Sequence, residues 1–538
     1  MTSPIFELAD RAVEAIADAD PITATGVGIA GRDHLWTDLS PDGHAARRDL
    51  FASLRAEAAA CPVEGPDETL AQRVMLDDLD ERVERHEAGH HLHDLNNIAS
   101  PFQAVHDVFA LMSEPGAVAT RLATMGGALA GYRTTLAEGA AHGDVASRRQ
   151  VRAAIAQGRA WSGPDGFAVE SARRAYAAMA DWLERDYLPV AAEADGVGAD
   201  RYRREARWHL GTDIDAVQTY AWGWSELDRL AARLREVAEV IAPGEPLATA
   251  MEVLHTDPAR CAGSAEEFLE LMAERQQTAL AQLAGTHFAV DDRIRAIEVN
   301  AAPSGGALAP YYTAPSEDFS RPGVVWYPLD ARVTFPLWEE VTTAHHEGFP
   351  GHHLQVGTQM ALGDRLSRYH RRLVWKPGSG EGWALYAEHL MGELGYLDRP
   401  DYEAGLLAAQ VFRSCRIVID IGLHLGLRIP TPADGNAIGF HPGEAWTAEL
   451  AVEMLQEWAF QSPAMARSEV VRYLGWPGQA ITYKLGEKAI LDLRAERQAA
   501  ARPAGAAPYD PVAFHSDVLG AGAVGLDLLA EVVRRSAD

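Results

Sequence analysis

The chain has 538 residues, enough for a large hydrophobic core and for either several domains or one large unit. Its composition, 47% hydrophobic and 23% charged, is that of an ordinary globular protein. With 77 acidic against 48 basic side chains the formal net charge is −29. This argues against nucleic acids and anionic membranes as partners, because surfaces that bind them need clustered lysine and arginine.

The cysteines and the amino terminus bear on the cellular compartment and on the kind of metal site. Cys61, Cys261 and Cys415 lie far apart, so neither a disulfide framework nor a thiolate zinc site is indicated. The amino terminus lacks a basic segment followed by an apolar run, and no stretch reaches the roughly 18 apolar residues of a membrane span. We therefore expect no export signal, no membrane-spanning helix and a cytoplasmic location.

Helical periodicity dominates the amino-terminal part of the chain, residues 1–290. Apolar residues recur at every third or fourth position in five segments: 5–19, 68–87, 117–140, 225–242 and 265–284. Such a pattern is typical of amphipathic helices that pack one face into a core. The sequence therefore predicts a helical amino-terminal part.

A short β-rich region, 291–335, interrupts this pattern. Three runs of β-branched and aromatic residues alternate there with Gly, Pro and Ser: 293–300, 309–315 and 323–329. Runs of this length between turn residues are typical of strands. They predict one small antiparallel sheet near the active site, directly before a histidine motif that begins at residue 346.

Helical patterns then continue over the carboxyl-terminal part, 336–538. The predicted helices cover 336–362, 381–396, 401–427, 443–460, 464–474, 478–500 and 522–535. We find neither an internal repeat nor a linker long enough to separate independent domains. The expected fold is one mainly α-helical unit over 1–538.

Two histidine motifs compete for the role of a metal site. The first, HEAGHH at 86–91, matches the His-Glu-x-x-His zinc signature letter for letter, with both histidines on one helix face. However, it follows the charged run LDDLDERVER and leads into HLHDLNN. This setting is typical of a solvated helix end, whereas a metal helix is normally packed into the protein. We expect HEAGHH to take no part in metal binding.

The second motif, HEGFPGHH at 346–353, lies in an apolar and aromatic stretch but has an irregular spacing. On a regular helix His346 and His352 would be turned about 600° apart, and His353 would lie about 10.5 Å along the axis. A local break at the Pro-Gly pair (350–351) would resolve this, since omitting the pair restores His-Glu-x-x-His. His352 is then the second ligand and His353 the alternative. A helix–turn–helix with ordinary buried histidines is the other interpretation.

A glutamate on the next helix supplies the third ligand. The sequence GSGEGWALYAEHLMGELGY at 378–396 predicts a helix with Glu381 at its start and Glu388 two turns later on the same face. Zinc in hydrolytic sites usually takes three protein ligands and leaves one position for water. His346, His352 and Glu381 are therefore the predicted ligands. Glu388 is either a solvated residue or a hydrogen-bond partner of one ligand.

Several stretches together resemble a known family. The similarity to the bacterial "domain of unknown function 885" family rests on DPITATGVG (20–28), TDLSPDG (37–43), HEGFPGHHLQ (346–355), EGWALYAE (381–388), RSCRIVIDIGLH (413–424), RYLGWPGQAITYKLG (472–486) and FHSDVLGAG (514–522). The resemblance covers nearly the whole chain. The family is similar in layout to helical zinc peptidases of the carboxypeptidase Taq and thimet oligopeptidase kind, in which two histidines and a glutamate on the next helix hold zinc.

The resemblance implies one zinc ion at His346, His352 and Glu381, with Glu347 as the base. It favours His352 because the first histidine of the PGHH segment is the steadier one in the family pattern. His345 stands where a small residue is usual, which makes it a further candidate ligand. The family name assigns no substrate.

Two further groups of polar residues accompany the motif. Four of them fall on one stripe of a predicted helix: Arg413, Arg416, Asp420 and His424. They form either an internal ion network that positions the metal helix, or a site at which an arginine binds a peptide carboxylate. In RYLGWPGQAITYKLGEK (472–488), Tyr483, and after it Tyr473, are candidate donors to the oxyanion of a hydrolytic reaction. The alternative for each is a core tyrosine with a satisfied hydroxyl.

These patterns predict a zinc-dependent hydrolase, foremost a metallopeptidase with Glu347 as general base and Tyr483 as a second catalytic residue. The alternatives are a zinc amidase or esterase acting on non-peptide bonds, and a non-catalytic helical binding protein with a vestigial site. The expected partner is a peptide or another small molecule. The sequence indicates no nucleic-acid or membrane partner and specifies no oligomeric state.

Overall fold

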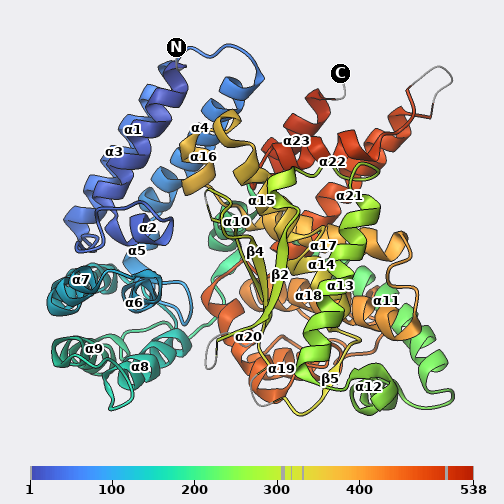
Figure 1. Cartoon of the computed structure of the whole chain (residues 1–538). Coiled ribbons are helices and arrows are strands. Elements are labelled where there is room, and N and C mark those ends of the chain that lie inside the picture. Colours follow the sequence, from blue (N-terminus) through green and yellow to red (C-terminus); the bar gives the residue numbers. More distant parts are fainter. Residues whose placement is uncertain (1–2, 304–308, 317, 330–331, 503–506, 537–538) are drawn as a thin grey trace. The chain divides into compact units, whose positions relative to one another are not determined.

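The computed structural model describes residues 3–303, 309–316, 318–329, 332–502 and 507–536 (Figure 1). The chain forms two compact units, each assembled from several stretches of sequence. Unit 1 comprises 1–197, 364–374 and 467–477, and unit 2 comprises 198–363, 375–466 and 478–538. Within the described ranges, no helix combines the length and the apolar character needed to cross a membrane.

Unit 1 is built from helices. They are α1 (Pro4–Ala19), α2 (Pro21–Gly26), α3 (Pro41–Ala60), α4 (Pro66–Glu87), α5 (His90–His93), α6 (Pro101–Asp107), α7 (Pro115–His142), α8 (Arg148–Ser162), α9 (Glu170–Trp182), α16 (Arg368–Leu373) and most of α20 (Pro463–Gly475). Six of the first seven begin with a proline, whose missing N–H has no helical partner there in any case. Phe102, Met125, Tyr132 and Tyr176 lie in a buried core that α6 to α9 share.

Unit 2 contains the remaining helices and both sheets. Its helices are α10 (Gly198–Leu210), α11 (Ala216–Ile241), α12 (Leu247–Thr256), α13 (Ala265–Leu283), α14 (Glu340–Glu347), α15 (His352–Ala361), α17 (Pro377–Glu393), α18 (Pro400–Leu425), α19 (Ala448–Glu457), α21 (Thr482–Ala500), α22 (Pro511–Gly520) and α23 (Leu526–Arg535). The prediction of a mainly α-helical protein is confirmed. Helix α22 was not predicted from the sequence.

The strands form two small sheets. Strands β1 (Cys261–Ala262) and β5 (Phe335–Pro336) pair antiparallel. The other sheet has the order β2–β4–β3, from β2 (Ile297–Ala301), β4 (Gly323–Tyr327) and β3 (Tyr311–Thr313). Strand β3 is antiparallel to β4, whereas β2 runs parallel to it, so this sheet is mixed rather than antiparallel throughout. Local sequence pattern predicts strands but does not specify which neighbours pair.

Glycines set the distance between the two helices of unit 2 that bear on the site. A Cβ atom at Gly382 of α17 would lie 2.5 Å from the backbone of Gly486 in α21. A Cβ atom at Gly486 would in turn lie 1.8 Å from the carbonyl oxygen of Gly378. The two backbones are therefore in direct contact, which no larger residue at these positions would allow. This contact fixes the helix that carries Glu381 against the helix that carries Tyr483.

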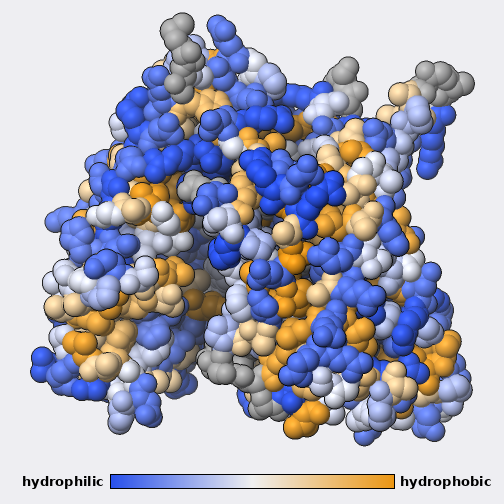
Figure 2. All heavy atoms as spheres, viewed as in Figure 1, coloured by the Kyte–Doolittle hydropathy of each residue, from blue (hydrophilic) through white to orange (hydrophobic). Residues whose placement is uncertain are grey.

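Hydrophilic and hydrophobic residues are interspersed on the face of the molecule shown in Figure 2. This is the usual condition of a folded protein, because more than half of the accessible surface is contributed by apolar atoms. The hydropathy of this face therefore does not by itself indicate a binding site.

Candidate metal centre

The helix that carries the second histidine motif is interrupted within the motif. Helix α14 ends at Glu347, α15 begins at His352, and the four residues 348–351 link them. The Phe349–Pro350 peptide bond in the link is cis. The predicted break at the Pro-Gly pair is therefore present, and it extends over 348–351. The first helix also starts later than 336, because Pro336 is part of strand β5.

Two side chains from other helices satisfy the backbone of the break. Gln276 of α13 donates from Nε2 to the carbonyl of Ala344 at 2.6 Å, and its Oε1 accepts from the N–H of Phe349 at 2.6 Å. Trp383 of α17 donates from Nε1 to the carbonyl of Pro350 at 2.9 Å. Both side chains are buried, so they replace hydrogen bonds that water cannot supply. Neither was identified from the sequence, since Gln276 lies 73 positions before Phe349.

The link runs so close to the end of α14 that it requires a glycine. A Cβ atom at Gly351 would lie 2.0 Å from the carbonyl oxygen of His346 and 2.4 Å from that of His345. Both neighbours are backbone atoms, so a side chain there would displace the turn itself. The turn that places His352 beside His346 therefore depends on this glycine.

We expect Gly351→Ala to lower the free energy of unfolding by about 1–3 kcal/mol, the usual range for overpacking a filled site. It should also weaken zinc binding, because the displaced turn carries His352. Thermal unfolding and zinc titration check both effects. Gly520→Ala is the matched control in the same unit, since a Cβ atom there meets nothing within 4 Å. An unchanged zinc affinity in Gly351→Ala would show that the turn does not set the site.

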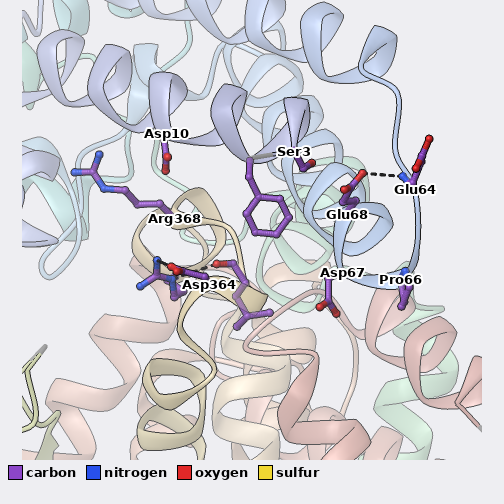
Figure 3. Close-up of a pocket in the computed structure, with 11 residues that line it drawn as sticks. Ser3, Asp10, Glu64, Pro66, Asp67, Glu68, Asp364 and Arg368 are labelled. Atoms are coloured by element: carbon purple, nitrogen blue, oxygen red, sulfur yellow. Dashed lines mark hydrogen bonds and ion pairs between the residues drawn. The ribbon is translucent and has the colours of Figure 1, made fainter. Parts of the chain in front are cut away.

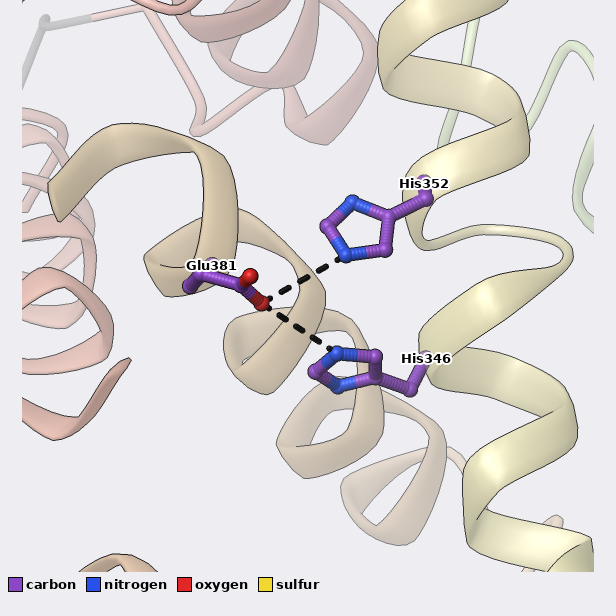
Figure 4. A group of neighbouring side chains, drawn as sticks. All are labelled: His346, His352 and Glu381. Carbon is purple, nitrogen blue, oxygen red and sulfur yellow. Dashed lines mark ion pairs between the residues drawn. The ribbon is translucent and has the colours of Figure 1, made fainter. Parts of the chain in front are cut away.

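His346, His352 and Glu381 converge on one point (Figure 4). Oε2 of Glu381 lies 3.5 Å from Nε2 of His346 and 3.5 Å from Nε2 of His352. The two imidazole rings are 5.0 Å apart between centroids and nearly perpendicular, at 89°. Among the residues that the structure describes, these three are the one group of potential ligands whose atoms all lie within 4.8 Å of one another. Glu381 belongs to the second turn of α17 rather than to its start, because Pro377 begins the helix.

Hydrogen bonds at the other ring nitrogens orient both histidines. His346 donates from Nδ1 to Oε1 of Glu388 at 2.7 Å, and Thr342 donates to the other oxygen of Glu388 at 2.8 Å. Nδ1 of His352 lies 3.4 Å from Oε1 of Gln355. With Nδ1 as the donor in each ring, Nε2 is the nitrogen that faces Glu381 and that a neutral ring would offer to a metal ion. A metal-binding histidine usually has this arrangement.

The charges of the cluster depend on one another. Burial lowers the pKa of His346, but hydrogen bonds to Glu381 and Glu388 outweigh burial and raise this pKa to about 10. Burial raises the pKa of Glu381, but hydrogen bonds from His346 and His352 bring it well below its usual value. The buried carboxylate thus attracts positive charge to the two Nε2 atoms. A divalent cation would satisfy the same demand.

Glu347 lies beside the cluster without joining it. It follows His346 directly, and its carboxyl is half-buried and forms no ion pair within 4.0 Å among the described residues. Burial raises the pKa of Glu347, and the charges of His346 and His352 partly oppose this effect. A carboxyl group with a raised pKa next to a metal site is suited to accept and release a proton.

The two alternative histidines have other contacts. His345 lies 3.0 Å through Nδ1 from the carbonyl of Phe349, and it lines a separate cavity of about 260 Å³ with Arg275 and Tyr396. His353 uses both ring nitrogens: Nε2 lies 2.7 Å from the carbonyl of Ile294 and Nδ1 lies 3.1 Å from the hydroxyl of Tyr312. Neither belongs to the His346 cluster. The geometry therefore favours His352 as the second ligand.

The HEAGHH motif lies in unit 1 and does not form a regular metal helix. Helix α4 ends one residue after His86, Gly89 is left-handed with φ 71°, and His90 begins the short helix α5. The ring of His86 stacks on that of His91, with centroids 4.3 Å apart, rather than facing an ion shared with His90. The motif therefore lacks the geometry of a zinc site.

Unit 1 also contains a pocket of about 590 Å³ (Figure 3). Its charged lining residues are Asp10, Glu64, Asp67, Glu68, Asp364, Arg368 and Arg371. Two of these groups already have partners, since Glu68 accepts from the N–H of Glu64 at 2.7 Å and Arg368 donates to Glu14 at 2.6 Å. Within the described part of the chain, no three of its carboxylates come close enough to share an ion.

The polar stripe on α18 separates into two groups. Asp420 accepts from the hydroxyl of Tyr202 at 2.7 Å and from the N–H of Gly478 at 3.0 Å, and His424 lies 3.6 Å away. These groups form a buried internal network. Arg413 and Arg416 lie instead against the rings of Phe412 and Tyr483. The internal-network interpretation therefore holds for Asp420 and His424, whereas carboxylate binding by an arginine stays a prediction for the other pair.

The two candidate tyrosines fall in different units. Tyr473 belongs to unit 1, and its hydroxyl donates to Glu469 at 2.6 Å. Tyr483 belongs to unit 2, is half-buried, and has its ring 4.6 Å from the guanidinium of Arg416 and 5.8 Å from that of Arg413. Only Tyr483 shares a compact unit with the metal cluster.

We expect Glu388→Gln to weaken zinc binding by about 10- to 100-fold, the usual effect of losing a carboxylate that orients a histidine ligand. The amide is similar in size but removes the charge that holds the Nδ1 proton of His346. Competition with a coloured chelator measures the affinity. Glu393→Gln is the control, because Glu393 lies on the same helix and is partly exposed. An equal affinity in both variants would mean that Glu388 does not support the ligand.

The fold and the cluster define the class of this protein: a mainly α-helical chain with a buried His-His-Glu group suited to a divalent metal. It belongs to the family described as "Bacterial protein of unknown function (DUF885)", whose model matches residues 21–533. The family resemblance noted in the sequence is thereby confirmed. Among curated proteins, none matches the chain significantly.

Two solved structures share the fold. One is described as "the putative lipoprotein from Colwellia psychrerythraea", with a TM-score of 0.80, 22% identity, and coverage of 99% of this chain and 98% of that one. The other, from Shewanella oneidensis, is described as "a putative lipoprotein of unknown function", with a TM-score of 0.74, 16% identity, and coverage of 99% and 100%. At these identities the likeness shows the fold alone.

Proposed function

We propose that this protein is a zinc-dependent hydrolase, foremost a metallopeptidase, with the ion held by His346, His352 and Glu381. The observation that carries the proposal is the convergence of two imidazole Nε2 atoms and one carboxylate oxygen beside a second, non-converging glutamate. Two histidines and one glutamate form a frequent ligand set of hydrolytic zinc sites.

The two distances between Glu381 and the histidine nitrogens fit zinc. Ligands bonded at 2.0–2.2 Å around a tetrahedral ion lie about 3.4 Å from one another. The two distances from Glu381 Oε2 to the histidine nitrogens are both 3.5 Å. Imidazole and carboxylate donors suit zinc, although they also accept other first-row divalent metals.

The residues around the ion have separate roles in this proposal. When bound in such a site, zinc polarises a carbonyl group and lowers the pKa of a coordinated water to about 7. Glu347 accepts the proton of the attacking water and passes it to the leaving amine. Burial raises the pKa of Glu347, which suits a carboxyl group that both accepts and releases a proton. Tyr483 is the candidate donor to the oxyanion. Its ring lies 5.8 Å from the guanidinium of Arg413, whose charge acts on Glu347.

The layout of the motifs adds support. A metal helix followed by a second helix with the third ligand resembles the helical zinc peptidases of the carboxypeptidase Taq and thimet oligopeptidase kind. In this chain α14 supplies His346 and Glu347, and α17 supplies Glu381. A peptide is accordingly the proposed substrate.

The experiment that tests the proposal combines metal analysis with a substrate panel. Protein purified without added zinc should contain about one zinc ion per chain, and it should hydrolyse short peptides. Hydrolysis of acyl esters or non-peptide amides alone would instead assign an esterase or amidase. Zinc without any hydrolysis would favour a binding protein with a vestigial site, and absence of zinc after reconstitution would refute the proposal.

A further inference from the structure

We propose that Arg413 of α18 binds a free carboxylate of the substrate, so that the preferred substrates are peptides whose terminal carboxyl group lies close to the scissile bond. This inference rests on the proposed hydrolase function and adds a substrate class to it.

Among the residues that the structure describes, none accepts a hydrogen bond from Arg413 or pairs with its charge. Its Nε atom is buried without a hydrogen-bond partner, and the described residues provide it with neither a hydrogen bond nor an ion pair. Other arginines of unit 2 with buried or half-buried side chains have such a partner: Arg332 lies 2.7 Å from Glu340, and Arg494 lies 2.7 Å from Glu393. A half-buried guanidinium without an acceptor is costly unless a ligand supplies one.

Arg413 lies against the ring of Tyr483 on α21, the helix whose backbone contacts α17 one residue after Glu381. Its positive charge lowers the pKa of Glu347 and of Glu388, which adjoin the metal cluster without being members of it. Glu347 is the proposed base, which must lie next to the scissile bond. A ligand group held by Arg413 is therefore held in the neighbourhood of the reacting atoms.

Aromatic rings hold the guanidinium without using its N–H groups. The centroid of Phe412 lies 5.3 Å from the guanidinium carbon of Arg413, and that of Tyr483 lies 5.8 Å from it. Stacking of this kind restrains the plane of the group and leaves its hydrogen-bond donors available. A planar fork of donors matches a carboxylate, which can accept two parallel hydrogen bonds.

The rival account is that Arg413 only balances the negative charge of Glu347 and Glu388. That account predicts that its loss affects every substrate alike. The carboxylate account predicts a loss confined to substrates that carry the carboxylate. The two accounts therefore differ in a measurable ratio, independently of how much activity is lost overall.

The experiment compares three forms of a short alanine peptide with the zinc-loaded full chain. One has a free terminal carboxyl group, one has a terminal amide, and one is an amide with a glutamate as its last residue. We expect wild type to favour the free acid over the plain amide by about 10- to 100-fold in kcat/KM. The glutamate amide carries a carboxylate on its side chain but none at its terminus. If this peptide is cleaved as fast as the free acid, Arg413 does not require a terminal carboxylate, and the inference is overturned.

The variants are Arg413→Met and Arg413→Lys. Arg413→Met should lose the preference for the free acid, with zinc content unchanged, and Arg413→Lys should keep part of it because the charge remains without the fork. Arg275→Met is the matched control, since Arg275 is also half-buried against a tyrosine ring but acts on His345. Equal losses for acid and amide, or no acid preference in wild type, would overturn the inference.

The same comparison separates this inference from the proposed function. Calorimetric binding of the acid and the amide to zinc-loaded Glu347→Gln needs no turnover. Suppose that the acid binds more tightly than the amide, that this difference depends on Arg413, and that wild type shows no hydrolytic activity. The carboxylate site would then be supported, and the proposed hydrolase function would be refuted. Hydrolysis of both peptides at equal rates would do the opposite.

Discussion

His352→Ala is expected to reduce bound zinc to a small fraction of one ion per chain and to abolish hydrolysis. The variant removes one of three ligand atoms, so its affinity should fall by more than the roughly 100-fold that loss of an outer hydrogen-bond partner produces. Its Nδ1 contact with Gln355 is long, at 3.4 Å, so the fold should lose little stability with the side chain. Zinc titration and metal analysis after gel filtration measure the effect.

His353→Ala is the matched control for this prediction. His353 is the adjacent buried histidine, and both of its nitrogens have partners outside the cluster, at Ile294 and Tyr312. It should lose stability but keep its zinc. The reverse pattern, with zinc lost in His353→Ala and kept in His352→Ala, would move the second ligand by one residue and contradict the site.

Glu347→Gln should keep a full complement of zinc and lose about 10²- to 10⁴-fold in kcat, the range attributed to a general base. The amide has nearly the same shape but cannot accept the proton. Because Glu347 lies outside the group of converging ligand atoms, the metal should stay bound. Activity assays and metal analysis on the same preparation separate the two effects.

The control is Glu87→Gln, which changes the corresponding glutamate of HEAGHH. Glu87 is exposed at the end of α4, and surface substitutions usually alter stability by less than about 0.5 kcal/mol. Neither zinc nor activity should change. Loss of zinc in Glu347→Gln would make Glu347 a ligand, and loss of activity in Glu87→Gln would return the first motif to consideration.

The helices and the break could be predicted because both depend on local sequence. Apolar periodicity marks the helices, and Pro350 with Gly351 cannot continue a helix regularly. The difference between the two histidine motifs could also be predicted, because charged residues flank HEAGHH whereas apolar residues flank the motif that begins at residue 346. The letter pattern alone would have chosen the first motif, because it says nothing of the left-handed Gly89, where the regular helix is broken.

The rest of the site depends on contacts between residues far apart in the chain. Gln276 and Trp383 stabilise the turn from two other helices, and nothing in their own neighbourhood marks them. The parallel pairing of β2 with β4 is likewise a property of the whole sheet. The sequence placed Arg413 on a polar stripe of one helix. Only the structure shows that no described residue near it accepts its hydrogen bonds. Local pattern therefore indicates the candidate ligands, whereas packing determines the residues that support them.

The central claim is that His346, His352 and Glu381 hold one zinc ion, and anomalous diffraction at the zinc edge from crystals of the zinc-loaded protein tests it most directly. We predict one strong anomalous peak per chain, bonded to Nε2 of both histidines and to a carboxylate oxygen of Glu381 at 2.0–2.2 Å. The carboxyl of Glu347 should lie near the peak without bonding to it. A peak at His86 and His90, or at His345 or His353 in place of His352, would contradict the account, as would a loaded crystal with no peak at this cluster.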